Sequence, residues 1–290
     1  MKKEIAKRLS GKELAEQILL SLREKIIKAE KNGKRPPSLA VFMAGNDPAS
    51  ALYVRTKKKT AHKLGIIFHD YCCNSKDEKE LLESIDFINK DESVDGIMAQ
   101  LPLPKGFNTD KIIKLIDPRK DVDGFHPDNL KKFEAGNISL LETRAIMPPT
   151  LKAVIALLDS IGEELGGKTA AIISRNEIFA DPLKAMLNLK DIKTEIAHTE
   201  DKKISGILKK SGIVIIAIGS PDFLKGDMIK DDVIIIDVGT TLIDEKLFGD
   251  VDFKSCAKKA FYISPVPGGV GPLTVAYLLE NVVNAWEKNI

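Results

Sequence analysis

Residues 45–57 are Gly45-Asn46-Asp47-Pro48-Ala49-Ser50-Ala51-Leu52-Tyr53-Val54-Arg55-Thr56-Lys57, and they follow an apolar run, residues 39–44, that is typical of a buried strand. Asp47 suits the N-cap of a helix. Pro48 suits the first helical position, because the amide hydrogen that proline lacks would have no partner within the helix there. The stretch therefore predicts a strand, a turn and a helix that ends at Gly65.

The predicted helix places a phenol and an amine on one face. Tyr53 and Lys57 are four residues apart, so their side chains rise above the same turn. Repulsion from the other cations of this helix, together with burial, is expected to lower the pKa of Lys57 toward a range useful for proton transfer. Those cations are Arg55, Lys58, Lys59 and Lys63. Taken alone, the pair is more typical of a solvated basic helix than of a catalytic site.

Four stretches together carry a family resemblance. Residues 45–57 resemble the Gly-x-x-Pro-Ala-Ser-x-x-Tyr-Val-x-x-Lys signature of the methylenetetrahydrofolate dehydrogenase/methenyltetrahydrofolate cyclohydrolase family. Residues 95–104 (Asp-Gly-Ile-Met-Ala-Gln-Leu-Pro-Leu-Pro), 120–127 (Lys-Asp-Val-Asp-Gly-Phe-His-Pro) and 264–272 (Ser-Pro-Val-Pro-Gly-Gly-Val-Gly-Pro) resemble the same family in the same order. One match would be weak, but four in register are specific.

The resemblance implies two consecutive reactions in one cleft. Methylenetetrahydrofolate is oxidised with a nicotinamide cofactor, and the methenyl product is hydrolysed to 10-formyltetrahydrofolate, within the one-carbon metabolism that supports purine biosynthesis. By resemblance, Lys57 transfers protons, Gln100 orients Lys57, Tyr53 stacks on the pterin, and Asp123 accepts two parallel hydrogen bonds from its amino-pyrimidine edge. The other implied folate contacts are Leu101, Gly268, Gly269 and Pro272.

Composition limits the remaining possibilities. The 290 residues are enough for two domains. A net charge of +2 argues against a nucleic-acid or membrane partner. No apolar segment follows the basic N-terminus, so we expect a cytoplasmic protein. The three cysteines and four histidines have no ligand spacing, so neither a disulfide framework nor a metal site is predicted.

Strand and helix patterns alternate along the chain, which predicts an α/β fold with two domains around a cleft. In the first domain, Ser10 and Glu13 predict a capped helix over 11–31, and Ser75 with Glu78 predicts another after a short strand at 66–68. A further strand, 97–99, places Gln100 at its carboxyl end, where ligands bind in open parallel sheets.

The second domain is predicted to be a Rossmann-like parallel sheet that binds a dinucleotide. Continuous apolar runs are typical of parallel strands buried on both faces. Strands are expected at 168–173, 193–198, 213–218 and 233–237, with helices at 181–189 and 203–210. A last helix, from Leu273 to about Glu287, is expected to return to the first domain. The predicted boundaries are 1–147 plus 275–290 for the folate-binding catalytic domain and 148–274 for the dinucleotide domain, and a homodimer is expected through the latter.

The phosphate-binding loop departs from the family pattern. Where the family has Gly-Arg-Ser-x-x-Val-Gly-x-Pro, this chain has Ser174-Arg175-Asn176-Glu177-Ile178-Phe179-Ala180-Asp181-Pro182. Both glycines are absent, and Phe179 and Ala180 are expected to add bulk, so weak cofactor binding is predicted. The implied cofactor contacts are Thr150, Ser174, Arg175, Asn176, Thr199, Thr240 and Thr274.

The expected cofactor is NADP, with NAD also possible. Arg175 favours a 2′-phosphate, whereas Glu200 favours a ribose hydroxyl, unless it merely caps the next helix. Three alternatives stay open. The chain is a cyclohydrolase alone, a non-catalytic folate-binding or scaffolding protein, or an unrelated Rossmann dehydrogenase. For the carboxylates Asp117, Asp121 and Asp123, a solvated acidic loop and a cation site are alternative interpretations, and neither is preferred to the folate role implied for Asp123.

Overall fold

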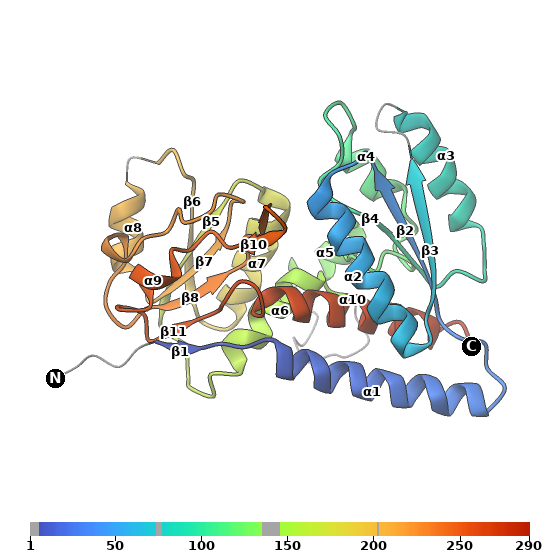
Figure 1. Ribbon diagram of the computed structural model, residues 1–290, viewed down its shortest axis with the longest axis horizontal. Coiled ribbons are helices and arrows are strands. Elements are labelled where there is room, and N and C mark those ends of the chain that lie inside the picture. The colour runs from blue at the N-terminus through green and yellow to red at the C-terminus, as the bar shows by residue number, and fades with distance from the viewer. Residues whose placement is uncertain (1–5, 74–76, 135–145, 202) are drawn as a thin grey trace. The chain divides into compact units, whose positions relative to one another are not determined.

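The computed structural model describes residues 6–73, 77–134, 146–201 and 203–290 (Figure 1). The chain forms two compact units. Ala15–Pro149 with Val275–Ile290 is called the three-stranded unit below, and Met1–Leu14 with Thr150–Thr274 the six-stranded unit. The predicted boundary is wrong at the N-terminus, because β1 (Lys7–Arg8) pairs in parallel with β11 (Tyr262–Ile263) and so joins the six-stranded unit.

The three-stranded unit contains a parallel sheet in the order β3-β2-β4. Its strands are β2 (Ser38–Ala44), β3 (Ile67–Cys73) and β4 (Gly96–Ala99). Its helices are α1 (Lys12–Lys31), α2 (Pro48–Leu64), α3 (Glu78–Asn89), α4 (Thr109–Leu115) and α5 (Pro127–Glu134), and α10 (Val270–Trp286) returns at the end of the chain. The division between the units falls within α1 and α10.

Helix α2 begins and ends as predicted. The Asp47 carboxylate accepts a hydrogen bond from the Ser50 amide at 2.7 Å, and Gly65 closes the helix with a φ of 87°. The cap of α3 differs from the prediction. Asp77 caps this helix by accepting from the Glu80 amide, whereas Ser75 lies outside the described residues.

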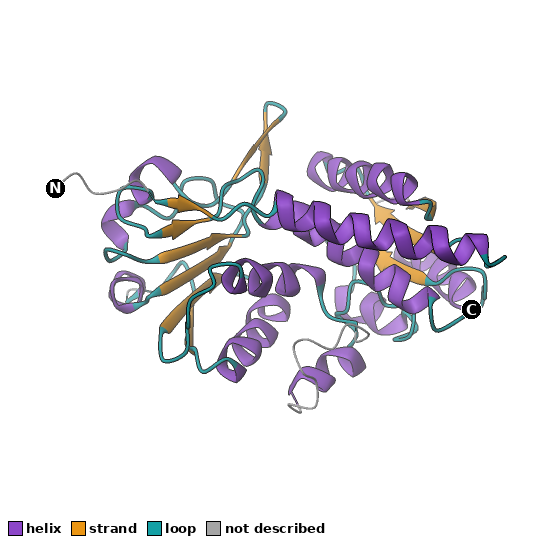
Figure 2. Cartoon of the chain, turned by 90° about the horizontal axis from the view of Figure 1, so that it is seen from below, coloured by secondary structure: helices purple, strands orange, loops and turns teal. Residues whose placement is uncertain are grey.

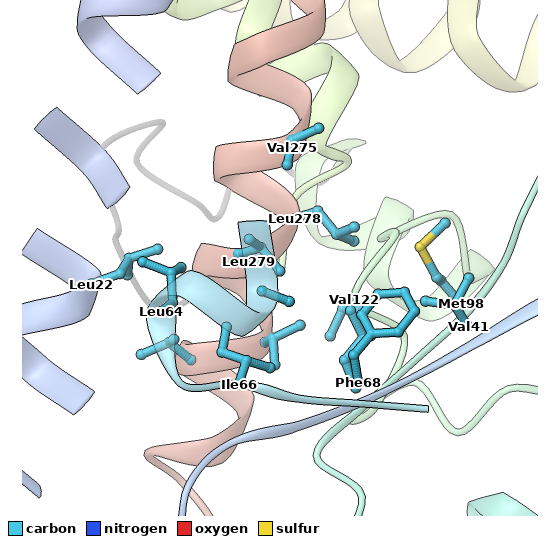
Figure 3. Packing of buried hydrophobic residues seen from close by; sticks show 14 of the residues in the cluster. Leu22, Val41, Leu64, Ile66, Phe68, Met98, Val122, Val275, Leu278 and Leu279 are labelled. Carbon is cyan, nitrogen blue, oxygen red and sulfur yellow. The ribbon is translucent and has the colours of Figure 1, made fainter. Parts of the chain in front are cut away.

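The core of the three-stranded unit fixes α2 against the sheet. Figure 3 shows Leu64, from the end of α2, near Leu22 of α1 and Leu279 of α10, while Val41 and Met98 from the sheet lie beside Val122 in the same buried cluster. Val275, Leu278 and Leu279 of α10 belong to the same buried cluster. The last helix therefore completes this core, which gives α2 a rigid base.

The six-stranded unit is built on a parallel sheet in the order β1-β11-β8-β7-β5-β6. Figure 2 shows the strands in orange and the helices in purple. Its remaining strands are β5 (Thr169–Ser174), β6 (Lys193–Ala197), β7 (Ile213–Ala217) and β8 (Ile234–Asp237). The helices are α6 (Pro149–Asp159), α7 (Glu177–Leu189), α8 (Ile204–Lys210), the 3-10 turn η1 (Gly226–Met228) and α9 (Phe253–Cys256), and β9 (Thr241–Ile243) with β10 (Lys246–Phe248) forms a hairpin.

Helix α7 begins four residues earlier than the predicted start at Asp181. Asn176 caps it, because its side chain accepts from the Ile178 amide at 2.9 Å. Asparagine is a strong N-cap residue, so this start was visible in the sequence. The prediction failed because it took residues 174–180 as a loop by analogy with the family's glycine-rich segment.

Strand order defines where this sheet binds ligands. After β5 the chain crosses through α7 to β6 on one side, and then through α8 to β7 on the other side of β5. The direction of winding reverses between β5 and β7. In open parallel sheets, ligands bind outside the carboxyl ends of the strands at such a point. Among the described helices, none combines the length and apolar character needed to cross a bilayer.

Candidate functional site

A buried lysine and glutamine form the centre of the candidate site. Lys57, on α2, is only 6% exposed, and its Nζ donates to Gln100 Oε1 at 2.8 Å. Gln100 directly follows β4, and its Nε2 donates to the Leu101 carbonyl at 2.6 Å. Because that second bond occupies the amide nitrogen, the amide oxygen is held toward Lys57. Met98 Sδ lies 3.7 Å from the same Nζ.

Burial lowers the pKa of Lys57, and the negative charge of Asp123 partly opposes that shift. The expected contribution from neighbouring cations is wrong. Lys58 is paired with Asp70 at 3.0 Å, and desolvation is the cause that lowers the Lys57 pKa. The amine is thus biased toward its neutral form by its surroundings, while a carboxylate remains close enough to act on it.

Asp123 is carried to the same end of the sheet by the segment that runs beside β4. The Ile97 amide donates to the Lys120 carbonyl at 2.7 Å, and the Val122 amide donates to the Ile97 carbonyl at 3.3 Å. Burial raises the pKa of Asp123 to about 6, although the positive charge of Lys57 lowers it. The residue keeps some accessible surface and lines a small crevice with Ala99, Leu101, Ile113, Ile116, Asp121 and Phe125.

The other two carboxylates of this stretch have structural partners. Asp121 is buried and accepts from the Gly124 amide, the His126 amide and the Asn129 side chain at 2.8–3.0 Å. Asp117 is paired with Arg119. Within the described ranges, no three His, Cys, Asp or Glu side chains are grouped as metal ligands. Of the three aspartates, Asp123 is therefore the one left to meet a ligand.

Two further residues of α2 lie on the helix face that carries Lys57. Tyr53 is partly buried, one turn before Lys57. Ser50, three residues before Tyr53, is 4% exposed, and its Oγ has no hydrogen-bond partner among the described residues. A buried hydroxyl without a partner is costly, which makes Ser50 a candidate ligand contact. Ser50 was not among the predicted site residues, although its spacing of three and seven residues from Tyr53 and Lys57 was the available signal.

The glycine loop before α10 lies in the six-stranded unit. Gly268 has a φ of +111°, and its carbonyl accepts from the Gly11 amide at 2.9 Å. A side chain on Gly269 would meet the Pro265 carbonyl oxygen at 2.8 Å, so this glycine permits close packing of the loop on itself. Pro272 stands in the first turn of α10. The role of these residues toward a folate stays a prediction.

The loop after β5 is ordered by its own side chains. Ser174 Oγ accepts from the Asn176 amide at 3.0 Å and donates to the Asn176 carbonyl at 3.2 Å, while Arg175 is exposed. The expected obstruction by Phe179 and Ala180 is wrong. Both side chains are buried on α7, at 8% and 2% exposure, so they do not fill the loop. No residue from Thr169 to Pro182 has a positive φ, so the absence of the two glycines leaves no strained backbone here.

The threonines predicted to contact the cofactor all belong to the six-stranded unit. Thr199 follows β6, and its hydroxyl donates to Glu200 at 2.8 Å. This bond lowers the pKa of Glu200, and the charge of Arg175 lowers it further, so the loops after β5 and β6 interact electrostatically. Thr150 lies in the first turn of α6, Thr240 follows β8, and Thr274 Oγ1 donates to the Val270 carbonyl at 3.2 Å.

Two family models match the chain. One, described as "Tetrahydrofolate dehydrogenase/cyclohydrolase, catalytic domain", matches residues 9–123. The other, described as "Tetrahydrofolate dehydrogenase/cyclohydrolase, NAD(P)-binding domain", matches residues 148–290. The chain is also 40% identical over 279 residues to the curated Bifunctional protein FolD of a Nitratiruptor species, with 96% of each chain covered.

Solved structures agree with these matches. The bifunctional FolD methylenetetrahydrofolate dehydrogenase/cyclohydrolase from Campylobacter jejuni is 38% identical, with a TM-score of 0.89 over 98% of this chain and 100% of that one. The Trypanosoma brucei enzyme, complexed with NADP cofactor and an inhibitor, is 31% identical, with a TM-score of 0.91 and 98% of each chain covered. With both family models in register and close relatives over nearly its whole length, the chain belongs to the tetrahydrofolate dehydrogenase/cyclohydrolase family.

Proposed function

We propose that the chain oxidises 5,10-methylenetetrahydrofolate to 5,10-methenyltetrahydrofolate with NAD(P) and hydrolyses the product to 10-formyltetrahydrofolate. The observation that carries this proposal is the buried Lys57–Gln100 pair beside Asp123. Relatives described as bifunctional favour both activities over a cyclohydrolase alone or a non-catalytic folate-binding protein. The finer assignment of roles to residues rests on the geometry of the site.

Hydrolysis of a methenyl cation requires water to add to the bridging carbon and to lose a proton. Lys57 is suited to take that proton, because burial favours its neutral amine at a lower pH than in water. Gln100 holds the amine in place through its amide oxygen. We assign to Tyr53, one turn earlier on the same helix, the role of stacking on the pterin.

Asp123 supplies the anchor for the pterin. Its ionised carboxylate would accept two parallel hydrogen bonds from an amino-pyrimidine edge, a strong and directional arrangement. Leu101 lines the same crevice and provides apolar contact. We assign Gly268, Gly269 and Pro272 to the folate site on the family resemblance.

The residues after β5 and β6 fit a dinucleotide phosphate. Arg175 presents an exposed guanidinium at the carboxyl end of β5, next to the point where the winding of the sheet reverses. Ser174, Asn176, Thr150, Thr199, Thr240 and Thr274 are the proposed polar contacts around it. When bound, NAD(P) supplies the hydride acceptor. The chain's part is to hold and orient it.

Substitution of Lys57 by methionine tests the proposed catalytic role. Methionine matches the length of lysine without its amine, so the Lys57→Met variant should fold and bind folate but lose cyclohydrolase activity by about a hundredfold or more. The matched control is Lys59→Met, an exposed position on the same helix, which should stay within a few-fold of wild type. Comparable activity in Lys57→Met and Lys59→Met would contradict the assignment.

We also propose a cytoplasmic homodimer. The family resemblance implies a dimer, and symmetric dimers are the commonest oligomers. Light scattering at micromolar concentration should give about twice the 31.9 kDa chain mass. A monomeric mass under those conditions would refute it.

A further inference from the structure

Two short segments of the six-stranded unit pack against each other reciprocally. Asp237 ends β8 and is followed two residues later by Gly239, while Gly249 directly precedes Asp250. A side chain on Gly239 would overlap the Asp250 carboxylate, and one on Gly249 would overlap the Asp237 carboxylate. Each aspartate therefore fills the space that the other segment's glycine leaves open. We call these four residues the Asp–Gly lock.

Asp250 uses its carboxylate to hold three consecutive backbone amides. Its Oδ2 accepts from Ile218 at 2.7 Å and from Gly219 at 3.1 Å, and its Oδ1 accepts from Ser220 at 2.6 Å. These amides lie 30 to 32 residues away in the sequence. The loop that follows β7 is thus shaped by a single distant side chain.

Asp237 in turn binds the backbone of the segment that carries Asp250. Its Oδ1 accepts from the amides of Gly239 at 3.0 Å and Asp250 at 3.1 Å, and its Oδ2 accepts from the Val251 amide at 3.1 Å. Asp237 and Asp250 are 3% and 0% exposed, and neither has an ion-pair partner among the described residues. Backbone amides rather than cations offset the cost of burying this pair.

The loop held by Asp250 lies where a parallel sheet binds its ligand. Residues 218–220 follow β7, which neighbours β5 at the point where the winding reverses. Gly219 is exposed, has a φ of +64°, and has no atom within 4 Å of where a side chain would be. The loop therefore presents open backbone beside the carboxyl end of β5, which bears Arg175. None of its residues was among the predicted cofactor contacts.

We propose that Asp250 is a positioning residue of the dinucleotide site, and that it fixes the shape of the loop 218–220 against which NAD(P) binds. This inference rests on the proposed dehydrogenase function. Asp237 acts one step further back, since it holds the amide of Asp250 itself. If Asp250 only stabilised the fold, its substitution would reduce both activities alike. If it is a positioning residue, its substitution weakens dinucleotide binding selectively.

The Asp250→Asn variant isolates the carboxylate at constant size. Asparagine keeps one acceptor oxygen but points an N–H₂ donor at backbone donors, so it cannot hold all three amides. The dissociation constants of NADP and of NAD, measured by calorimetry on the purified full chain, should rise about tenfold or more. Hydrogen exchange at amides 218–220 should accelerate, and methenyltetrahydrofolate hydrolysis, which needs no dinucleotide, reports whether the rest of the chain is folded.

Asp252→Asn is the matched control, because Asp252 caps the short helix α9 two residues away and asparagine caps helices equally well. Its affinity for both dinucleotides should equal that of wild type. Unchanged affinity in Asp250→Asn would overturn the inference and leave the dehydrogenase proposal intact. A wild-type chain that binds neither NADP nor NAD would overturn both.

A second variant decides the matter if Asp250→Asn does not fold. Gly219→Ala alters only the exposed loop, where alanine is disfavoured at positive φ, so the fold should be kept. The same titration should show NAD(P) affinity reduced by about threefold or more. Wild-type affinity in Gly219→Ala would show that the loop does not bind the dinucleotide, and would overturn the inference.

Discussion

Lys57 lies in surroundings that favour its neutral amine, the form that can accept a proton, over the charged ammonium. A lysine ammonium has three donors, and within the described part of the chain Lys57 has one strong acceptor in Gln100 Oε1 and a weak one in Met98 Sδ. Because its desolvation is only partly offset, the neutral amine is favoured relative to water. A protein that needed only stability would place an apolar residue here.

On the role proposed for Asp123, its raised pKa should make folate binding dependent on pH. Above its pKa of about 6 the side chain is an acceptor, and below it the added proton spoils one of the two parallel hydrogen bonds. The KM for the folate substrate should therefore rise by up to about tenfold per pH unit between pH 6 and pH 5. The Asp123→Asn variant should show a high KM that no longer changes over this range.

Loss of folding does not account for that rise. A carboxyl whose folded pKa is raised keeps its proton in the folded state between pH 3.8 and about 6, after the unfolded chain has lost it. Its contribution therefore favours folding at the acid end of this window and is lost as the pH rises through it. A KM that stayed flat in wild type from pH 7 to pH 5 would contradict the assigned role of Asp123.

The candidate site was predictable only where a motif carried it. Lys57, Gln100 and Asp123 were predicted because they stand at the positions of the family motifs. Burial was one of the two causes expected to lower the Lys57 pKa, but the other, repulsion from neighbouring cations, was wrong, because the extent of burial depends on how α2 packs in the core. Asp250 was missed for a different reason. Its partners are backbone amides, which leave no signature in the sequence.

At the scale of elements, α2 depends on a C-cap that also receives a side chain from α1. Gly65 has a φ of 87°, and a side chain there would lie 2.9 Å from Arg23 Nη1, which donates to the Leu64 carbonyl at 2.8 Å. Alanine at this position should therefore strain the backbone and also disturb the bond that ties the two helices together.

The Gly65→Ala variant should lower the free energy of unfolding by about 2–3 kcal/mol, of which roughly 1–2 kcal/mol is the cost of the left-handed backbone. Gly33→Ala is the matched control, because Gly33 has a φ of +76° but no atom within 4 Å of the added carbon. It should show the backbone cost alone. Urea denaturation of both variants measures the difference, and equal losses would show that the Arg23 contact contributes nothing.

Element types were more predictable than element ends. The strands β7 and β8 and the two ends of α2 were predicted from the sequence, because buried parallel strands and helix caps have strong local sequence requirements. The start of α7 at Glu177 was missed because a family pattern was followed in place of the local cap at Asn176. The pairing of β1 with β11 joins residues more than 250 apart, and two residues of strand carry no pattern of their own.

At the scale of the whole molecule, the residues that depart from the family pattern lie in the part proposed for dinucleotide binding rather than in the part proposed for hydrolysis. The residues proposed for hydrolysis, Lys57, Gln100 and Asp123, keep the family motifs. In the loop after β5, the Asn176 amide is bonded to Ser174 Oγ and the Ile178 amide to Asn176 Oδ1, so two amides that a phosphate needs are already engaged. Glu177 adds a negative charge in the first turn of α7.

Dinucleotide affinity should therefore be modest, with a dissociation constant above about 10 µM, while cyclohydrolase activity is well preserved. Arg175 limits the loss of dinucleotide affinity, because an exposed guanidinium can still pair with a phosphate. Calorimetric titration of NADP and NAD into wild type measures the constant. The Glu177→Gln variant removes one like charge from the helix end, and should tighten binding by about threefold. Glu195→Gln, an exposed change on β6, is the control and should leave the affinity unchanged. Tight, low-micromolar binding to wild type would show instead that the loop reorganises around a phosphate and that the engaged amides are released at little cost.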